Sequence, residues 1–223
     1  MDTSSFFDFS NELSGNTLSL FDLNKKNQDH SIIAEKRGLS SERLAIPEQI
    51  HSAEITCVDT PGNYLGTDGL ITDNPDIILI IKVADCVPIY LFESKSQIIG
   101  LVHSGWRGTV KGIIINTVNK MLEMGANKNA INIFMGPSIG FCCYKVERDV
   151  ADKFDIKSKE KLKNGKWKVG LYEQLYIMLI KLGIPSNNIR VSNICTFESL
   201  DYHSYRRDRS QSGRMVALMR LKS

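Results

Sequence analysis

Apolar residues gather along the chain in short runs that predict β-strands. Residues 76–83 form a near-continuous apolar run, as expected for a strand buried on both faces. Residues 87–92 and 97–103 continue the β pattern and are separated by the polar segment 93–96, which has the length of a hairpin connection. We therefore expect a hairpin next to a deeply buried strand.

Other segments complete the predicted set of elements. Strands are expected at 53–58, 131–135, 189–194 and 214–221, the last of them apolar on both sides until its end. From Thr109 the apolar spacing becomes helical, with Thr109 as N-cap and Gly125 as the stop. Further helices are expected at 146–154 and 172–182, the second apolar on most sides and therefore buried.

The order of these elements predicts the fold class. Many strands, several of them consecutive, with only a few helices favour α+β layers over a doubly wound parallel sheet. Neither GxGxxG nor GxxxxGK[ST] occurs, which gives no support to a dinucleotide fold or a P-loop. With 223 residues and no Pro/Gly/Ser-rich linker, the simplest organisation is a single domain over 1–223.

Composition and charge narrow the location and the partners. No apolar run approaches the ~20 residues of a membrane helix, and residues 1–8 lack the basic and apolar regions of a secretory signal. The five cysteines form an odd set without CxxC spacing, which favours free thiols in a reducing compartment. A net charge of +3, largely interspersed, is too weak for a general nucleic-acid binder. We expect a cytoplasmic protein that binds neither nucleic acid nor membrane; no pattern sets its oligomeric state.

Three side chains are candidate metal ligands. His51 follows Gln49-Ile50, Cys86 ends the most buried predicted strand, and His103 ends another apolar strand. Imidazole nitrogen and thiolate sulfur suit Zn²⁺, and three protein ligands with an open fourth position are typical of a catalytic site. The three residues are far apart in sequence, so only the tertiary fold brings them together. From residue types alone, a core thiol and hydrogen-bonded structural histidines are the commoner interpretation.

Several motifs in a fixed order carry a resemblance to a known family. The chain resembles the YfiH family of laccase-domain proteins, once labelled multicopper polyphenol oxidases, over the span from Gln49 to Met215. The matching motifs are Gln49-Ile50-His51, Thr67-Asp68-Gly69-Leu70-Ile71-Thr72, Ala84-Asp85-Cys86-Val87-Pro88, His103-Ser104-Gly105-Trp106-Arg107-Gly108, Gly136-Pro137-Ser138-Ile139-Gly140-Phe141-Cys142-Cys143-Tyr144, Cys195-Thr196 and Ser204-Tyr205-Arg206-Arg207-Asp208.

The resemblance implies a fold and an activity. The fold would have α/β/β/α layers, with mixed β-sheets flanked by helices. The enzyme would be a purine nucleoside phosphorylase and adenosine deaminase that acts on adenosine, inosine, guanosine and methylthioadenosine, with phosphate as co-substrate. It would hold Zn²⁺ through the residues matching His51, Cys86 and His103. Phe141, Lys145 and Arg209 depart from the family pattern, Arg209 standing where glycine is common.

Further candidate residues follow from the chemistry. Asp85 and Asp68 are candidate catalytic carboxylates that orient a ligand or move a proton, or else cap a turn. The guanidinium groups of Arg107, Arg206 and Arg207 match phosphate oxygens. If residues 205–208 are extended, neighbouring side chains alternate faces, and only one of Arg206 and Arg207 is then expected to meet substrate.

Two adjacent thiols and three other activities remain as alternatives. Cys142 and Cys143, next to a Gly-Pro loop, either contact the site or pack in the core. The same residue types also fit a metal-free cysteine hydrolase with Cys86 as nucleophile and His103 as base. A role in editing peptidoglycan precursors is another alternative. A copper phenol oxidase is disfavoured, because a multicopper cluster needs many more histidines than the four present.

Overall fold

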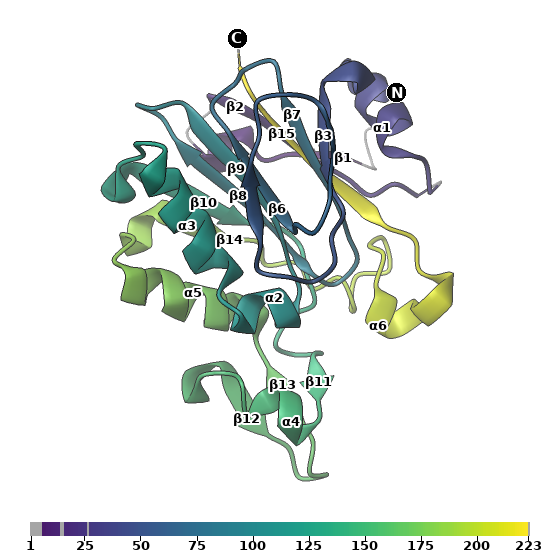
Figure 1. Cartoon of the computed structure of the whole chain (residues 1–223). Coiled ribbons are helices and arrows are strands. Elements are labelled where there is room, and N and C mark those ends of the chain that lie inside the picture. The colour runs from purple at the N-terminus through teal and green to yellow at the C-terminus, as the bar shows by residue number, and fades with distance from the viewer. Residues whose placement is uncertain (1–5, 14–15, 26, 223) are drawn as a thin grey trace.

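The computed structural model describes residues 6–13, 16–25 and 27–222, and two six-stranded sheets dominate it (Figure 1). The first sheet has the order β1-β2-β15-β7-β3-β5. Its strands are β1 (Phe6–Asp8), β2 (Thr17–Asp22), β15 (Met215–Leu221), β7 (Ile78–Val83), β3 (Leu44–Pro47) and β5 (Gly62–Tyr64). β3 runs parallel to β5 and β7 and the other pairs are antiparallel, so the sheet is mixed.

The second sheet has the order β14-β10-β8-β9-β6-β4 and is also mixed. Its strands are β14 (Ile189–Val191), β10 (Ile131–Met135), β8 (Val87–Glu93), β9 (Ile98–Ser104), β6 (Gly69–Thr72) and β4 (Ile55–Cys57). β8 and β9 pair antiparallel, which confirms the hairpin expected over 87–103. β4 and β14 are shorter than the expected runs.

The strands at the centre of each sheet are buried on both faces. In β8, Ile89 and Leu91 belong to one apolar cluster, whereas Tyr90 and Phe92 belong to the cluster between the two sheets. β7 and β15 likewise contribute to two clusters, one of them between the sheets. This double burial explains their continuous apolar sequences, because neither face of such a strand meets water.

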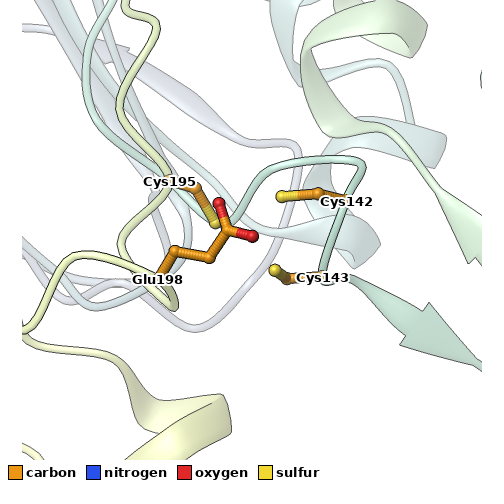
Figure 2. A group of neighbouring side chains, drawn as sticks. All are labelled: Cys142, Cys143, Cys195 and Glu198. Atoms are coloured by element: carbon orange, nitrogen blue, oxygen red, sulfur yellow. The ribbon is translucent and has the colours of Figure 1, made fainter.

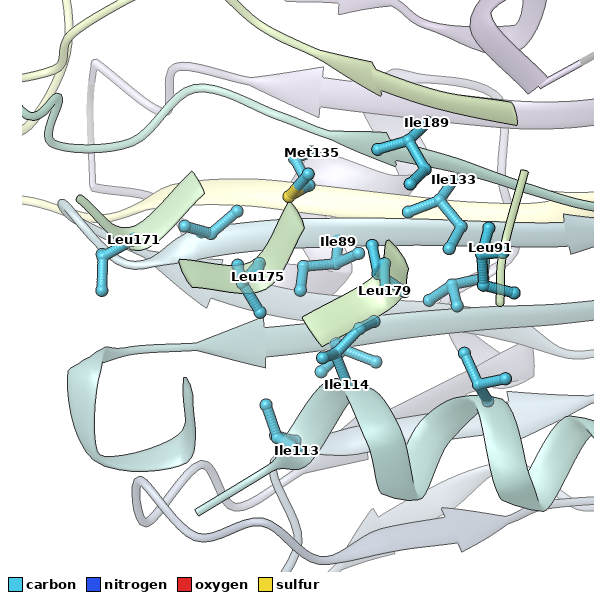
Figure 3. Packing of buried hydrophobic residues seen from close by; sticks show 14 of the residues in the cluster. Ile89, Leu91, Ile113, Ile114, Ile133, Met135, Leu171, Leu175, Leu179 and Ile189 are labelled. Atoms are coloured by element: carbon cyan, nitrogen blue, oxygen red, sulfur yellow. The ribbon is translucent and has the colours of Figure 1, made fainter. Parts of the chain in front are cut away.

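Helices cover the outer face of each sheet. α1 (His30–Lys36) packs on the first sheet through Ile33 and Ala34. α3 (Ile113–Glu123) and α5 (Leu171–Leu182) pack on the second sheet, where they bury isoleucine and leucine side chains against β8 and β10 (Figures 1 and 3). The layers are therefore α/β/β/α, which confirms the expected fold class.

The helices expected from Thr109 and at 172–182 require correction. The helix expected from Thr109 is divided into α2 (Trp106–Val110) and α3, because Gly112 adopts a left-handed φ of 86° that ends the first helix. Thr109 lies inside α2 and its hydroxyl pairs with Ser104, so it is not the N-cap. α5 is not buried on most sides: Tyr176 is 39% exposed, since only one face of the helix packs on the sheet.

A smaller unit extends from one end of the layers (Figure 1). It contains β11 (Lys145–Val146), β12 (Lys159–Lys161), β13 (Trp167–Val169) and α4 (Arg148–Ala151). The helix expected at 146–154 is thus a single turn, because Val146 pairs with Trp167 in the small sheet. Residues 205–208 form the short helix α6 (Tyr205–Asp208), so the strand alternation considered for Arg206 and Arg207 does not apply.

Three other expectations concern location. In the part of the chain that the structure describes, no helix has the length and apolar character needed to cross a membrane. All five cysteines are free thiols. Residues 1–5, which carry most of the argument about a signal sequence, lie outside the described residues.

Candidate metal centre

Three side chains from distant parts of the sequence converge at one end of the sheets. His51 follows β3, Cys86 lies in the turn between β7 and β8, and His103 belongs to β9. One donor atom from each lies within 4.8 Å of the others. The Cys86 Sγ is 3.9 Å from the His51 Nε2, and the two imidazole rings are nearly perpendicular, with centroids 4.8 Å apart. The structure therefore brings together the ligands predicted from sequence.

Strand pairing explains why these residues meet. In the β8–β9 hairpin, Pro88 pairs with His103 and Val87 pairs with Ser104. Cys86, one residue before β8, therefore lies beside the end of β9. His51 is placed by Gln49, whose side-chain amide exchanges two hydrogen bonds of 2.7 and 2.8 Å with the backbone of Lys82 in β7. Two strand ends and one tethered loop thus form the centre.

Asp68 organises two of the candidate ligands. Its fully buried carboxylate accepts hydrogen bonds from the backbone N–H groups of His51 and Ser52 at 2.9 and 2.6 Å. It also lies 2.8 Å from the His103 Nδ1, which leaves Nε2 to face the centre. Burial would raise the pKa of Asp68, but the hydrogen bonds from His103 and Ser52 outweigh it and lower the pKa below its usual value. A carboxylate in this position fixes the ring orientation of a metal-binding histidine.

The electrostatics of the centre favour a thiolate. Burial alone would raise the pKa of the Cys86 thiol, but the charge and hydrogen bonds of His103 and His51 lower it to about 6. The pKa of His103 rises to about 9 against the effect of its burial, because Cys86 and Asp68 stabilise the imidazolium. A thiolate is the form of cysteine that binds metals and attacks carbon. The pair therefore suits both a metal centre and a nucleophile.

The donor set fits zinc. Two imidazole nitrogens and one sulfur are preferred zinc ligands, and three protein ligands leave one position for substrate or water. Gly105 keeps the space between them open: a Cβ at this position would lie 2.9 Å from both the Cys86 Sγ and the His51 Cδ2. Only glycine at position 105 allows Cys86 and His51 to approach this closely.

The Gly105→Ala variant should test this close approach. We expect the added methyl group to push Cys86 and His51 apart and to weaken zinc binding by about 10- to 100-fold, as for other disturbances around a metal ligand. Zinc affinity is measured by competition with a chromophoric chelator. Gly100→Ala in the preceding strand β9 is the control, because its Cβ would meet only ordinary contacts of 3.6 Å or more. Equal affinity in both variants would contradict the prediction.

The candidate centre opens into a pocket of about 710 Å³. This volume is in the range of small-molecule sites. Basic side chains outnumber acidic ones in its lining, which contains Lys82, Arg107, Arg206, Arg209 and Arg214. Aromatic rings hold several of these cations: the Arg107 Cζ lies 4.5 Å from the centre of the Trp106 ring, and the Arg206 Cζ lies 5.0 Å from that of Tyr144. The pocket combines flat apolar surfaces with positive charge.

Backbone strain is concentrated around this pocket. Gln49, His51, Asp85 and Arg209 all line it and all have positive φ, between 53° and 75°. Such conformations are uncommon for residues other than glycine and are often found at functional sites. The φ of 53° and ψ of −128° at Arg209 are of the kind that glycine adopts most easily, so an arginine here is held in a strained backbone conformation.

The other predicted site residues have different surroundings. Asp85 lines the pocket and accepts hydrogen bonds from the Thr196 hydroxyl and the Arg206 N–H at 2.8 and 2.6 Å. Arg207 is absent from the lining, and its guanidinium donates to the carbonyl oxygens of Thr196, Phe197 and Tyr202. The helical turn of α6, rather than strand alternation, separates the two arginines.

Cys142 and Cys143 lie apart from the candidate metal centre, beside Cys195. Burial and neighbouring groups raise the pKa of both thiols above the ordinary value. A protonated thiol is a poor nucleophile. The structure therefore gives no support to either as an activated nucleophile.

Sequence reasoning did not select Lys82, Arg209 or Arg214. Lys82 interrupts the apolar run that begins at Ile77, and this single charged residue in a buried strand was the one sequence signal that pointed to a residue lining a site. Arg214 precedes the last strand, next to no motif, and its guanidinium carbon lies 5.7 Å from the centre of the Tyr205 ring. Only the fold brings these cations to the pocket.

Comparison with known proteins places these features in a family. The fold and site define a four-layer α/β protein with a candidate three-ligand metal centre in a cationic pocket. The sequence profile of a family described as "Multi-copper polyphenol oxidoreductase laccase" matches residues 22–222, so the chain belongs to that family. The crystal structure of the Bacillus licheniformis hypothetical protein YfiH superposes with a TM-score of 0.87 at 27% identity, covering 99% of this chain and 98% of that one. The resemblance stated from sequence is confirmed.

Two curated relatives have enzymatic names. A protein of Deinococcus radiodurans called "Purine nucleoside phosphorylase" is 32% identical over 89% of this chain and 81% of its own length. A protein from an unknown prokaryotic organism called "Adenosine deaminase RL5" is also 32% identical, over 82% of this chain and 76% of its own length. Both relatives match most of this chain, and their names describe enzymes that act on purine nucleosides.

Proposed function

We propose that this protein is a zinc-dependent purine nucleoside enzyme of the cytoplasm. It catalyses phosphorolysis of adenosine, inosine, guanosine and methylthioadenosine, and hydrolytic deamination of adenosine. The observation that carries the proposal is the convergence of His51, Cys86 and His103 at the wall of a cationic pocket. The names of the relatives supply the substrate class.

The donor set favours zinc over a copper cluster. Only two of the four histidines, His51 and His103, belong to the centre. His203 contacts the Asn24 carbonyl oxygen, and His30 lies beside Asp29. A multicopper cluster needs many more imidazoles than this group offers. The family's descriptive name therefore does not fit the ligands of this chain.

The chain's own residues have distinct roles in the proposed chemistry. Bound zinc would act as a Lewis acid and would lower the pKa of a water molecule next to the purine base of the substrate. Asp68 holds the His103 ring with Nε2 toward the centre. In deamination, the amino group at C6 of adenine is exchanged for the oxygen of water, and ammonia leaves. Asp85, within the same pocket, holds the backbone of Arg206 in place.

Phosphorolysis makes a different demand on the pocket. A phosphate oxygen bonds to C1′ of the sugar while the bond from C1′ to the purine nitrogen breaks, giving the free base and ribose 1-phosphate. The phosphate must therefore lie next to C1′, where arginine forks match its oxygens. Arg206 is well placed for this role, since Asp85 fixes its backbone and Tyr144 supports its guanidinium.

A product assay tests the proposal. Zinc-loaded protein is incubated with adenosine, with and without phosphate, and the products are separated by chromatography. We expect adenine and ribose 1-phosphate only when phosphate is present, and inosine in both cases. Folded, zinc-loaded protein that forms none of these products would overturn the proposal.

The Arg206→Ala variant tests the phosphate site. Loss of a charge-assisted hydrogen bond, at about 1.5–3 kcal/mol, should raise the KM for phosphate by about 10- to 100-fold. Deamination, which uses no phosphate, should change much less. Steady-state kinetics with phosphate as the varied substrate measure the effect. An equal loss in both reactions would show that Arg206 does not act on phosphate.

A further inference from the structure

A second group of metal-binding side chains lies outside the pocket described above. Cys142, Cys143, Cys195 and Glu198 each offer one donor atom, and these atoms lie within 4.8 Å of one another. Figure 2 shows the three sulfur atoms and the carboxylate turned toward a common space between two chain segments. We call these four residues the tricysteine cluster.

Two adjacent strands build the tricysteine cluster. β10 and β14 run parallel, with Met135 opposite Val191, so the loops that follow them leave the sheet at the same edge. The loops stay together because the Thr196 N–H donates to the Ser138 carbonyl oxygen at 2.9 Å. Cys142 and Cys143 come from the first loop, and Cys195 and Glu198 come from the second. The cluster is thus held by backbone pairing rather than by chance contact of side chains.

The surroundings of the sulfur atoms suit a bound cation. The Gly140 N–H donates to the Cys195 Sγ at 3.2 Å, so backbone from the loop of Cys142 and Cys143 fixes the position of the third sulfur atom. A Cβ on Gly140 would lie 3.1 Å from the Cys142 Sγ, so glycine permits this close approach.

The neighbouring pocket carries further negative charge. Cys142, Cys195 and Glu198 line a pocket of about 590 Å³ together with Glu173. The Glu173 Oε2 is buried without a hydrogen-bond partner among the described residues. Lys157 is the one lysine or arginine in the described lining. The charge around the tricysteine cluster is therefore complementary to a cation.

We propose that the tricysteine cluster binds its own Zn²⁺ ion, separate from the candidate centre at His51, Cys86 and His103. Thiolate and carboxylate are both zinc ligands, and the four side chains together supply the four donors of a closed, structural site. Zn–S bonds of about 2.3 Å place sulfur atoms about 3.8 Å apart, so the present separations require only small side-chain rotations. Each thiol that binds releases its proton to solvent.

This ion would stabilise the wall of the pocket rather than take part in the reaction. It would join the loop that carries Tyr144 to the loop that carries Thr196. The Thr196 hydroxyl donates to Asp85 and its carbonyl oxygen accepts from Arg207. Tyr144 supports Arg206. The supports of Arg206 and Arg207 therefore lie on the two loops that the tricysteine cluster connects.

Zinc stoichiometry tests the proposal. Reduced wild-type protein and the Cys195→Ser variant are loaded with zinc, dialysed against a weak chelator and analysed for metal and protein. We expect the variant to hold one equivalent fewer than wild type. With Co²⁺ in place of zinc, the variant should also lose most of the sulfur-to-metal absorption assigned to three thiolates. Cys57→Ser, at an exposed position outside both groups, is the matched control and should match wild type.

Two additional variants keep the outcome clear. Cys142→Ser changes an exposed side chain and should also lose one equivalent, while circular dichroism confirms that it folds. Cys86→Ala reports on the other centre alone. If that centre held no zinc, Cys86→Ala would match wild type while Cys195→Ser still lost one equivalent. Equal zinc content in wild type, Cys195→Ser and Cys142→Ser would overturn the proposal.

Discussion

Replacing Cys86 by alanine is expected to reduce both proposed activities, adenosine phosphorolysis and adenosine deamination, by about three orders of magnitude. The side chain supplies the only sulfur among the three candidate ligands at the pocket wall. A metal that polarises substrate or water contributes several kcal/mol to a reaction, and each 1.36 kcal/mol corresponds to a factor of ten in rate. Initial rates and zinc content should fall together when the variant and wild type are compared under identical loading.

One control variant and one alternative mechanism define what this result means. Cys57→Ala changes a cysteine outside both metal-binding groups and should keep wild-type rates. If the protein is instead a metal-free cysteine hydrolase, the active wild-type protein should contain no zinc. The pKa of about 6 at Cys86 suits that mechanism too. Active wild-type protein that contains no zinc and loses activity on alkylation of Cys86 would favour the hydrolase.

Replacing Arg207 by alanine is expected to lower the free energy of unfolding by about 3 kcal/mol. Its Nη1 donates to the Thr196 and Phe197 carbonyl oxygens at 2.9 and 3.0 Å, and its Nη2 donates to the Tyr202 carbonyl oxygen at 2.8 Å. Each lost hydrogen bond of this kind contributes about 1 kcal/mol. The melting temperature should therefore fall by about 6–12 °C for a chain of this size.

The neighbouring arginine is the natural comparison for this prediction. Arg206→Ala should change the melting temperature much less, because its guanidinium lies at the pocket and makes one hydrogen bond to a carbonyl oxygen, that of Lys145. Arg207→Lys keeps the charge but loses the planar fork, so it should recover only part of the stability. Thermal unfolding followed by circular dichroism measures all three variants. Equal melting temperatures for Arg206→Ala and Arg207→Ala would contradict the assigned roles.

The pattern of apolar residues predicted the central strands closely. β7, β8, β9, β10 and β15 all lie where largely apolar runs occur, because strands buried on both faces carry few polar side chains. The same pattern placed Cys86 and His103 at the ends of predicted strands, and both residues lie at the β8–β9 hairpin. Helix boundaries were predicted less well, since a single left-handed residue, Gly112, divided one expected helix into two.

By itself, the sequence determined the layered fold, the family and the three candidate ligands, because local hydrophobic patterns and short motifs carry that information. Only the tertiary structure decided which cations reach the pocket and which support the backbone. Arg206 and Arg207 are adjacent and chemically identical, yet one turn of helix directs the first to the pocket and the second to the carbonyl oxygens of residues 196–202. The tricysteine cluster is also tertiary, because its members meet only where two parallel strands end side by side.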